Sequence, residues 1–396
     1  MKKPVKVGLI GSGCISYTYL HNMTRLFSIL DVKGCSDLIE DRSRSRAEQF
    51  GIHQMTNEEI WNDPEIELVI NTTYPISHYE VTKASLEAGK HVFCEKMMAT
   101  NFKEARELYD LSIEKGLRLG QAPDTFLGGG LQTARKLLDA GMIGEPFGAQ
   151  AMVIRSNRLL GETKEERLPF TFMEGGSIPF DMGGYYIHAL VNMLGPVHRV
   201  TGFSKAFSPI VMQRNPKHPD YQKPISMTAP TLMTAALEFC NGCYGNLTTM
   251  AESHVGEIPR LEIYGTEGTL ILPDPNTFYG PVYLMRGQKG EPMEMPVTHG
   301  YGENLPDPGV GTQEERAWRN SYRGIGAADL AWGLRNGRPH RCSAELGLHA
   351  MEIIHGVETS CCEEKIYTMA TKPERPEALP AGFLFGTASE ACLDTK

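Results

Sequence analysis

The stretch Val5-Lys-Val-Gly-Leu-Ile-Gly11-Ser-Gly13-Cys-Ile-Ser16 predicts a β-strand, a tight turn and the start of a helix, in that order. A helical pattern continues from Tyr17 to Ser28, so the turn has the form Gly-x-Gly-x-x-Ser. In such a turn the first glycine makes the bend, and the second lets the backbone approach a pyrophosphate on the helix N-terminus. The last position needs only a small residue, which Ser16 supplies. This stretch therefore predicts a dinucleotide-binding unit.

Asp37 indicates which dinucleotide this unit prefers. The second predicted strand, Val32 to Ser36, ends at Asp37, which lies 26 residues after Gly11. A carboxylate there accepts hydrogen bonds from the adenosine ribose hydroxyls and repels a 2′-phosphate. Leu38 follows it, at a position where Arg or Ser would favour NADP. The arginines at 42, 44 and 46 leave NADP as the less favoured alternative, and we expect NAD.

The stretch Gly89-Lys-His-Val-Phe-Cys-Glu95-Lys96 places a lysine at the edge of the same sheet. A predicted helix, Ser77 to Ala88, ends at Gly89, which can adopt the left-handed cap conformation. His91 to Cys94 reads as a buried parallel strand, and ligands bind at the carboxyl ends of such strands. There Lys96 could hold its charge against a substrate hydroxyl or, with a lowered pKa, accept a proton. A solvated lysine after a strand is the alternative.

The pattern up to residue 124 predicts an α/β fold with a doubly wound parallel sheet. Glu67 to Asn71 is another strand, and its exit loop Thr72-Thr73-Tyr74-Pro75 leads into the helix that carries His78. A helix from Asn101 to Lys115 follows, and the unit closes near Leu119-Gly-Gln121-Ala-Pro123. A chain of 396 residues is too long for one core. We expect a Rossmann domain over 1–124 and a substrate-binding and oligomerisation domain over 125–396.

The second half predicts an α+β domain with a large, mostly antiparallel open sheet. After a helix from Thr133 to Asp139, long β-runs alternate, and turn signals such as Asn241-Gly242 join several of them. The strands expected are 147–155, 197–204, 231–239, 243–251, 260–264, 269–272 and 282–285. Two polar, proline-rich stretches, 204–230 and 287–323, are predicted to be long functional loops.

One predicted helix, Ile178 to Leu194, carries an unusual polar stripe. Asp181, Tyr185 and His188 stand at i, i+4 and i+7, so an α-helix would project them from one face. A helix cap at Asp181 and a buried, hydrogen-bonded His188 would explain them structurally. Because the same chain carries a dinucleotide motif, we favour a role in proton transfer.

Composition excludes several classes of protein. A net charge of -9 argues against nucleic-acid or anionic-membrane partners, and no apolar run has the length of a membrane span. Glycines interrupt any signal-peptide core near the N-terminus, so we expect a cytoplasmic protein. The nine cysteines are scattered and expected to be reduced, with Cys240 and Cys243 flanking a hairpin turn. No histidine or cysteine spacing predicts a metal site.

Taken together, the motifs resemble those of the Gfo/Idh/MocA oxidoreductase superfamily over nearly the whole chain. They are the Gly11-Ser-Gly13 turn, Ala88-Gly-Lys-His-Val-Phe-Cys-Glu95-Lys96, Gly141-Met-Ile-Gly144, Gly175-Gly-Ser-Ile-Pro-Phe-Asp181-Met-Gly-Gly-Tyr185, Ile263-Tyr-Gly-Thr-Glu-Gly-Thr-Leu270, Arg338-Pro-His340-Arg341 and a helix through His349. The resemblance implies that Lys96 is the family's catalytic lysine and Asp181 its acid. Tyr185 stands where many members have His and some have Tyr, and His188 where others carry Asp or Thr. Met97 replaces the usual proline.

The resemblance implies an NAD-dependent enzyme that moves a hydride between nicotinamide and a carbinol carbon of a sugar, sugar derivative, glycoside or polyol. The predicted catalytic residues are Lys96, Asp181, Tyr185 and His188. The predicted cofactor-binding residues are Gly11, Ser12, Gly13, Cys14, Ile15, Asp37, Thr72, Thr73, His78, Glu95, Lys96 and Gln121. A homo-oligomer, dimer or tetramer, is expected by analogy. The alternatives are a glycosidase that uses NAD transiently and a non-catalytic sugar or NAD sensor on the same fold.

Overall fold

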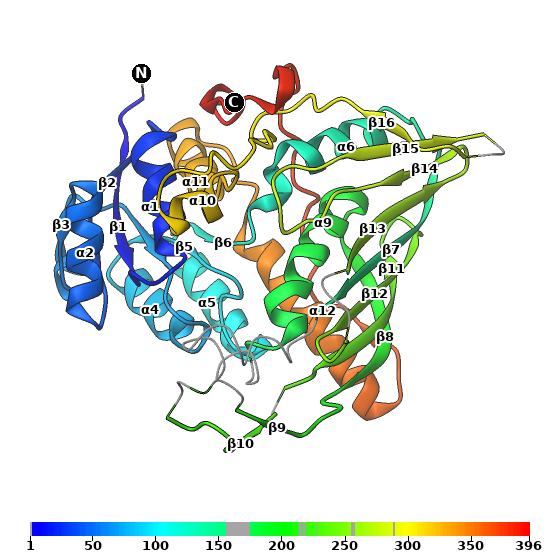
Figure 1. Cartoon of the computed structure of the whole chain (residues 1–396), viewed down its shortest axis with the longest axis horizontal. Coiled ribbons are helices and arrows are strands. Elements are labelled where there is room, and N and C mark those ends of the chain that lie inside the picture. Colours follow the sequence, from blue (N-terminus) through cyan, green and yellow to red (C-terminus); the bar gives the residue numbers. More distant parts are fainter. Residues whose placement is uncertain are drawn as a thin grey trace.

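The N-terminal part of the chain, from Val5 to Gln121, forms a six-stranded parallel sheet (Figure 1). This computed structural model describes residues 2–155, 175–213, 216, 219–227, 229–254, 258–287 and 290–396. The strand order is β3-β2-β1-β4-β5-β6. The strands are β1 (Val5–Ile10), β2 (Leu30–Ser36), β3 (His53–Gln54), β4 (Leu68–Asn71), β5 (His91–Cys94) and β6 (Leu119–Gln121). The predicted doubly wound sheet is confirmed.

Helices connect these strands and cover both faces of the sheet. They are α1 (Ser16–Arg25), α2 (Glu40–Phe50), α3 (Asn57–Asn62), α4 (Pro75–Glu87) and α5 (Phe102–Glu114). α4 ends as expected, because Gly89 adopts a φ of +78°. The strand order reverses between β1 and β4, so the loops after β1, β4 and β5 meet at one edge of the sheet.

The second half forms a nine-stranded sheet in the order β16-β15-β14-β13-β7-β12-β11-β8-β17. Its strands are β7 (Pro146–Ile154), β8 (Val197–Lys205), β11 (Leu232–Phe239), β12 (Tyr244–Met250), β13 (Ile258–Gly265), β14 (Gly268–Ile271), β15 (Val282–Arg286), β16 (Met293–Met295) and β17 (Tyr367–Thr368). Its neighbouring strands are antiparallel except for β7 and β12. The mostly antiparallel sheet is therefore also confirmed.

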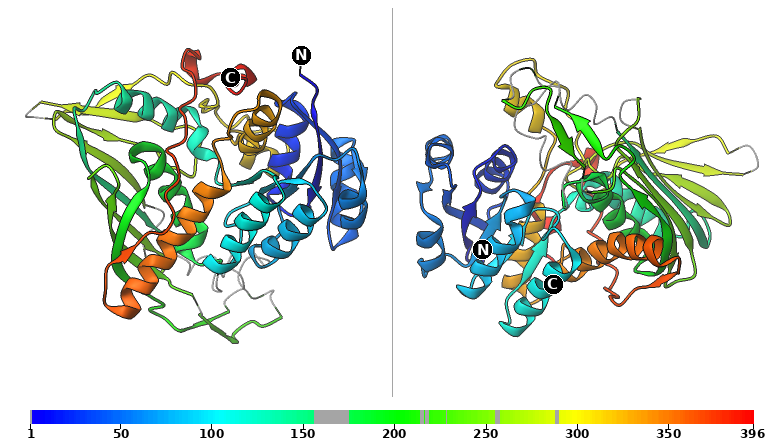
Figure 2. Two further views of the ribbon diagram at one scale, coloured as in Figure 1. Left: turned by 180° about the vertical axis from the view of Figure 1, so that it is seen from behind. Right: turned by 90° about the horizontal axis from the view of Figure 1, so that it is seen from below.

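Helices cover one face of this second sheet and leave the other face open. α6 (Gly129–Asp139), α9 (Gly184–Leu194) and α12 (Ala344–Glu363) lie between the two sheets (Figure 2). On the open face, Phe203 and Tyr244 are exposed. The burial of alternate residues along β11 reflects this division into a covered and an open face.

Segments distant in sequence return to the Rossmann half. α11 (Ile325–Asn336) packs against β5 and β6, and a Cβ on Gly326 would lie 2.6 Å from the ring of Phe93. The buried Asp124 carboxylate accepts the N–H groups of Gly324 and Gly326 at 2.9 and 3.1 Å, which fixes the start of α11. Because α11 packs on the Rossmann sheet although it lies beyond residue 124, the domain boundary at residue 124 stays a prediction.

The structure differs from the sequence expectations in three stretches. The stretch 204–230 contains a small hairpin of β9 (Ile210–Met212) and β10 (Pro224–Ser226), and 287–323 contains β16 and α10 (Gln313–Trp318). The reason for α10 is local, since Thr312 and Glu315 form a capping box. The predicted helix 178–194 begins as a π-helical turn, η2 (Pro179–Gly183), before α9.

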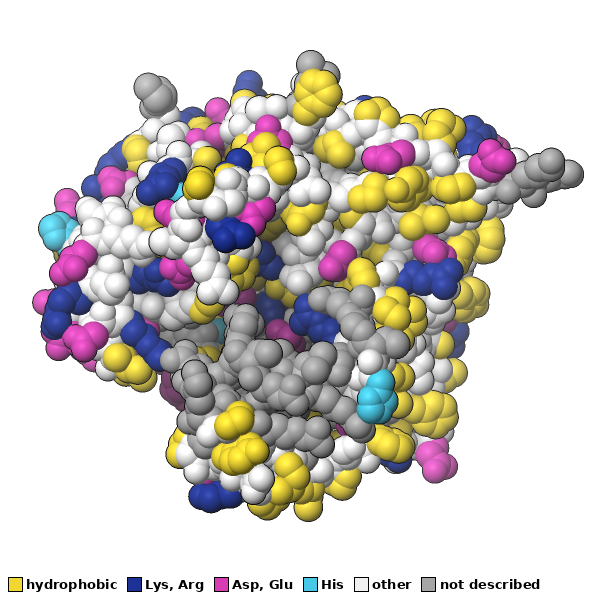
Figure 3. Space-filling model, viewed as in Figure 1, with side chains coloured by type: hydrophobic (Ala, Val, Ile, Leu, Met, Phe, Trp, Pro, Cys, Tyr) yellow, Lys and Arg dark blue, Asp and Glu magenta, His cyan; other side chains and the backbone are white. Residues whose placement is uncertain are grey.

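In the part of the chain that the structure describes, no helix is long and apolar enough to cross a membrane. The same residues contain no group of three or more His, Cys, Asp or Glu side chains that could hold a metal ion. All nine cysteines are free thiols. In the view of Figure 3, basic and acidic side chains are interspersed over the surface of the Rossmann part, on the left.

Candidate active site

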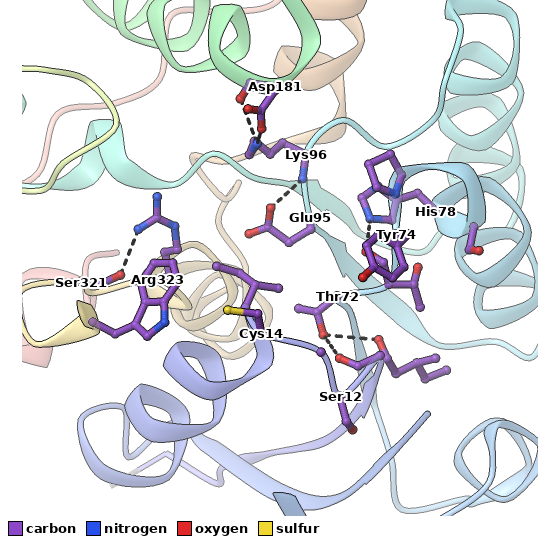
Figure 4. A pocket seen from close by; sticks show the side chains of 18 of the residues that line it. Ser12, Cys14, Thr72, Tyr74, His78, Glu95, Lys96, Asp181, Ser321 and Arg323 are labelled. Carbon is purple, nitrogen blue, oxygen red and sulfur yellow. Dashed lines mark hydrogen bonds and ion pairs between the residues drawn. The ribbon is translucent and has the colours of Figure 1, made fainter. Parts of the chain in front are cut away.

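A cavity of about 1660 Å³ lies at the edge of the Rossmann sheet where the strand order reverses. Pockets for small ligands usually measure roughly 300–1000 Å³, so this cavity has room for a dinucleotide together with a second molecule. The view into it shows side chains from both halves of the chain converging (Figure 4). Of the predicted cofactor-binding residues, it is lined by Gly11, Ser12, Gly13, Cys14, Ile15, Asp37, Thr72, Thr73, His78, Glu95 and Lys96.

The glycine turn after β1 fits a pyrophosphate. Gly11 has a φ of +102°, and a Cβ there would lie 2.6 Å from the backbone of Thr72 and Thr73, so only glycine fits. A Cβ on Gly13 would meet no atom within 4 Å, because that residue faces open space. The Thr72 hydroxyl donates to the Gly11 carbonyl oxygen at 2.7 Å and holds the turn in place. A ligand can therefore approach the backbone of Gly13 closely, at the N-terminus of α1.

Asp37 lies beside this turn, where the ribose of a dinucleotide would lie. Its carboxylate accepts the backbone N–H groups of Ser12 at 2.7 Å and Ile39 at 2.8 Å. Of the nearby arginines, Arg46 donates from Nη2 and Nη1 to the two carboxylate oxygens of Glu314 on α10, at 2.6 and 2.9 Å. The Arg46 charge is thus already paired with a carboxylate across the rim of the cavity.

Lys96 and Asp181 form an ion pair across the two halves of the chain. The Lys96 Nζ atom donates to Asp181 Oδ1 at 2.8 Å and to the Asp181 carbonyl oxygen at 2.9 Å (Figure 4). Burial is the largest single influence and favours the neutral amine, but Asp181, Tyr185 and Glu95 together outweigh it, so the pKa of Lys96 lies above its ordinary value. Arg155, at the end of β7, approaches the other Asp181 oxygen at 3.7 Å. Lys96 is therefore a cation here and not a lowered-pKa base.

Tyr185 faces two cations. Its ring centroid lies 5.2 Å from the Lys96 Nζ atom, and its hydroxyl accepts a hydrogen bond from Arg323 Nη2 at 3.1 Å. Arg323 belongs to the segment just before α11, and sequence reasoning did not identify it. The predicted pairing of Tyr185 with Lys96 in one site agrees with this geometry.

His188 does not share the face of Asp181 and Tyr185, which corrects the expectation from i, i+4, i+7 spacing. The π-helical turn η2 is wider than an α-helical turn, so side chains after it are displaced around the axis. The His188 ring is fully buried, its centroid lies 6.2 Å from that of Phe126, and its Nδ1 contacts the Gly184 carbonyl oxygen. It is not among the residues that line the cavity.

Two other predicted residues, His78 and Gln121, form hydrogen bonds with the backbone of the loop that follows Lys96. Gln121 is fully buried outside the cavity, and its side-chain oxygen accepts the N–H of Met98 at 3.1 Å. His78 lines the cavity, and its two ring nitrogens contact the carbonyl oxygens of Met97 and Thr73. Both side chains therefore support the loop that follows Lys96. The Lys96–Met97 peptide bond is cis.

Three buried histidines should make the fold sensitive to mild acid. Burial lowers the pKa of His188, His299 and His349 to about 4, below the ordinary value of about 6.5. At a pH between these two pKa values, the unfolded chain binds protons at the three histidines, whereas the folded chain does not. The free energy of unfolding should therefore decrease as the pH is lowered. The slope would be up to about 1.4 kcal/mol per pH unit for each histidine.

Urea unfolding between pH 6.5 and 5 measures this slope. Burial raises the pKa of Asp124 to about 6, so this one carboxyl contributes with the opposite sign and offsets part of the effect of the histidines. We expect His188→Asn to reduce it, whereas substitution of the exposed His53 by Asn should leave it unchanged. A free energy of unfolding that is constant over this interval would contradict the prediction.

Two family models match this chain. A model described as "Oxidoreductase family, NAD-binding Rossmann fold" matches residues 5–122, and the GFO/IDH/MocA C-terminal domain matches residues 131–271. An inositol 2-dehydrogenase/D-chiro-inositol 3-dehydrogenase of Lactiplantibacillus plantarum is 32% identical over 152 residues, which are 36% of this chain and 42% of that protein. The match thus spans less than half of this relative.

Other relatives align over nearly the whole chain at lower identity. A scyllo-inositol 2-dehydrogenase (NADP(+)) of Bacillus subtilis is 24% identical over 387 residues, covering 91% of this chain and 95% of that protein. A levoglucosan dehydrogenase in complex with NADH superposes with a TM-score of 0.77 at 20% identity, over 93% of this chain and 100% of that one. An NAD-binding Rossmann domain and a matching C-terminal domain together identify the chain as a member of the Gfo/Idh/MocA family of oxidoreductases.

Proposed function

We propose that this protein is an NAD-dependent dehydrogenase that acts on a CH–OH group of a sugar, sugar derivative, glycoside or polyol. The observation that carries this proposal is the convergence of Lys96, Asp181 and Tyr185 beside the dinucleotide turn. These residues come from both halves of the chain and surround one part of the cavity. The inositol and levoglucosan dehydrogenases among the relatives support a polyhydroxylated substrate.

In this proposal, the chain's own groups position the substrate and move its proton. When NAD is bound, its nicotinamide supplies the two-electron acceptor or donor. The Lys96 ammonium donates a hydrogen bond to the reacting oxygen and stabilises negative charge on it. Tyr185 accepts the hydroxyl proton as its phenolate during oxidation and, as the neutral phenol, returns that proton during reduction. Asp181 holds Lys96 in place through the 2.8 Å contact.

A substrate screen tests the proposal. Purified protein is incubated with NAD and a panel of sugars, inositols and glycosides, and reduced nicotinamide is followed by its absorbance. We expect reduction of NAD with at least one polyhydroxylated compound. Release of an aglycone without net reduction of NAD would instead indicate a glycosidase. Binding of NAD and sugar without either reaction would indicate a sensor.

Asp37 should set the preference for NAD over NADP, because its carboxylate would repel a 2′-phosphate. We expect the native protein to bind NAD more tightly, and Asp37→Ala to narrow that preference by about tenfold or more, as expected for loss of a charged hydrogen-bonding partner. Titration calorimetry with both dinucleotides measures the ratio. Asp41→Ala is the control, because Asp41 is exposed on α2 and pairs with Arg44. Tighter binding of NADP by the native protein would overturn the assignment.

A further inference from the structure

Arg323 is a buried cation that contacts the proposed proton-transfer residue. Its Nη2 atom donates to the Tyr185 hydroxyl oxygen at 3.1 Å, and only 9% of the residue is exposed. The contact joins positions separated by 138 residues, from α9 and from the segment that leads into α11. Figure 4 shows the Arg323 side chain at the cavity with its partner Ser321.

Several groups fix the position of this guanidinium. Nη1 donates to the Ser321 hydroxyl at 3.0 Å, and Nη2 also donates to Asn276 Oδ1 at 2.9 Å. The Trp318 ring centroid lies 5.5 Å from its central carbon. The Asn22 side chain donates to the Arg323 carbonyl oxygen at 2.9 Å and so ties the segment to α1.

The charge of Arg323 is not cancelled by a direct carboxylate contact. Among the described residues, its hydrogen-bond partners are hydroxyl, amide and carbonyl oxygens. A guanidinium in such a site keeps its charge, and the Tyr185 hydroxyl is the phenol that it contacts directly. The carboxylates whose charges act on Arg323 without a direct contact are those of Glu95 and the buried Asp124. The other charged groups of the cavity lining on this side are Lys96, Arg155, Asp181, Glu314 and Arg316.

The direction of the Arg323–Tyr185 hydrogen bond is fixed by chemistry. Arginine has no acceptor atom, so its N–H donates and the tyrosine oxygen accepts. The O–H of Tyr185 must therefore point elsewhere, and the cavity lies on its open side. A donated cationic hydrogen bond also stabilises the phenolate that Tyr185 becomes when it gives up its proton.

We infer that Arg323 is a positioning residue that acts through Tyr185, orienting its O–H toward the substrate oxygen and stabilising its phenolate. The inference rests on the proposed function. It assigns to Arg323 a role separate from the one proposed for Lys96, which is to bind the reacting oxygen itself. A structural role, in which Arg323 only joins Asn276 to Ser321, is the competing explanation.

Kinetics of Arg323→Gln, Arg323→Lys and Tyr185→Phe, alone and combined, separate these explanations. We expect Arg323→Gln to lower kcat for oxidation by about 10- to 100-fold, as for loss of a charged hydrogen bond, and to move the acidic limb of the rate profile to higher pH. Arg323→Lys should restore part of the rate, because it keeps the charge. In the Tyr185→Phe background, Arg323→Gln should add no further loss of kcat. NAD affinity and melting temperature should stay near native values.

Arg319→Gln is the matched control, since Arg319 is exposed on the same segment and lies outside the cavity lining. It should leave the kcat and its pH profile unchanged. Equal losses from Arg323→Gln with and without the Tyr185 hydroxyl would overturn the inference. So would an unmoved pH profile.

A spectroscopic titration tests the inference even if no panel compound is turned over. The ultraviolet absorbance of the parent minus that of Tyr185→Phe isolates the Tyr185 phenolate as pH rises. Repeated in the Arg323→Gln background, the difference should appear at higher pH. A phenolate that forms at the same pH in both backgrounds contradicts a role for Arg323, whereas absence of turnover contradicts only the proposed function.

Discussion

Lys96→Ala should abolish turnover while leaving NAD affinity nearly unchanged. The Lys96 Nζ atom is bound by Asp181 and stands beside Tyr185, whereas the glycine turn that would hold the pyrophosphate is built from β1 and supported by Thr72. Loss of a positioned group that acts on the reacting oxygen should lower kcat by at least about a hundredfold. Steady-state kinetics with the substrate found by the screen measures kcat, and titration calorimetry measures NAD binding.

Two companion variants make this result specific. Lys96→Arg retains a cation but displaces it, and we expect it to stay strongly impaired because the geometry of the ion pair changes. Lys103→Ala removes an exposed lysine from α5 and should behave like the parent. Near-native turnover of Lys96→Ala would show that the stretch 89–96 is only the end of a strand.

Tyr185→Phe should lower kcat by about 10² to 10⁴-fold, the range expected for loss of a general acid or base. The substitution removes one oxygen atom and retains the aromatic ring. Because Tyr185 is only 5% exposed and its ring packing is kept, the melting temperature should change little. In the proposed mechanism, Tyr185 and not His188 receives the proton, because the His188 ring lies outside the cavity lining.

A pair of pH–rate profiles tests this assignment. Burial lowers the pKa of His188 to about 4, so its ring stays neutral across the assay range, and His188→Asn should retain the acidic limb of the profile. Tyr185→Phe should lose both rate and limb. If His188→Asn removes the acidic limb while Tyr185→Phe keeps rate and profile, the two roles must be exchanged.

Local signals were enough to predict the Rossmann half. β5 was predicted with its observed bounds, since a short apolar run stands between a capping glycine and two charged residues. Asp181, Tyr185 and His188 were predicted to share a face from their α-helical spacing, and Asp181 and Tyr185 both line the cavity. The π-helical turn η2 displaced His188, and Pro179 near its start was the sequence feature that could have indicated an irregular helix.

Arg323 could not be predicted because its role depends on tertiary contacts alone. It is the last residue of a polar, proline-rich stretch without periodicity, and its partners include Tyr185 of α9 and Asn276 of a distant loop. The only sequence signal was the expectation that residues 287–323 form a functional loop. Such contacts require the folded arrangement of both halves of the chain.

The return of α11 and the C-terminal segment to the Rossmann sheet bears on how this protein could acquire new specificity. α11 covers β5 and β6, and Glu390 accepts the backbone N–H groups of Ser28 and Ile29 at 2.9 Å. Exchange of residues 1–124 with the corresponding part of a relative would therefore transfer only part of a packed layer and leave mismatched partners on α11. Recombination of whole modules is a costly route to new specificity in this architecture. Point substitutions around the cavity, such as at Asp37 or Arg323, keep the shared layer intact and are the accessible route.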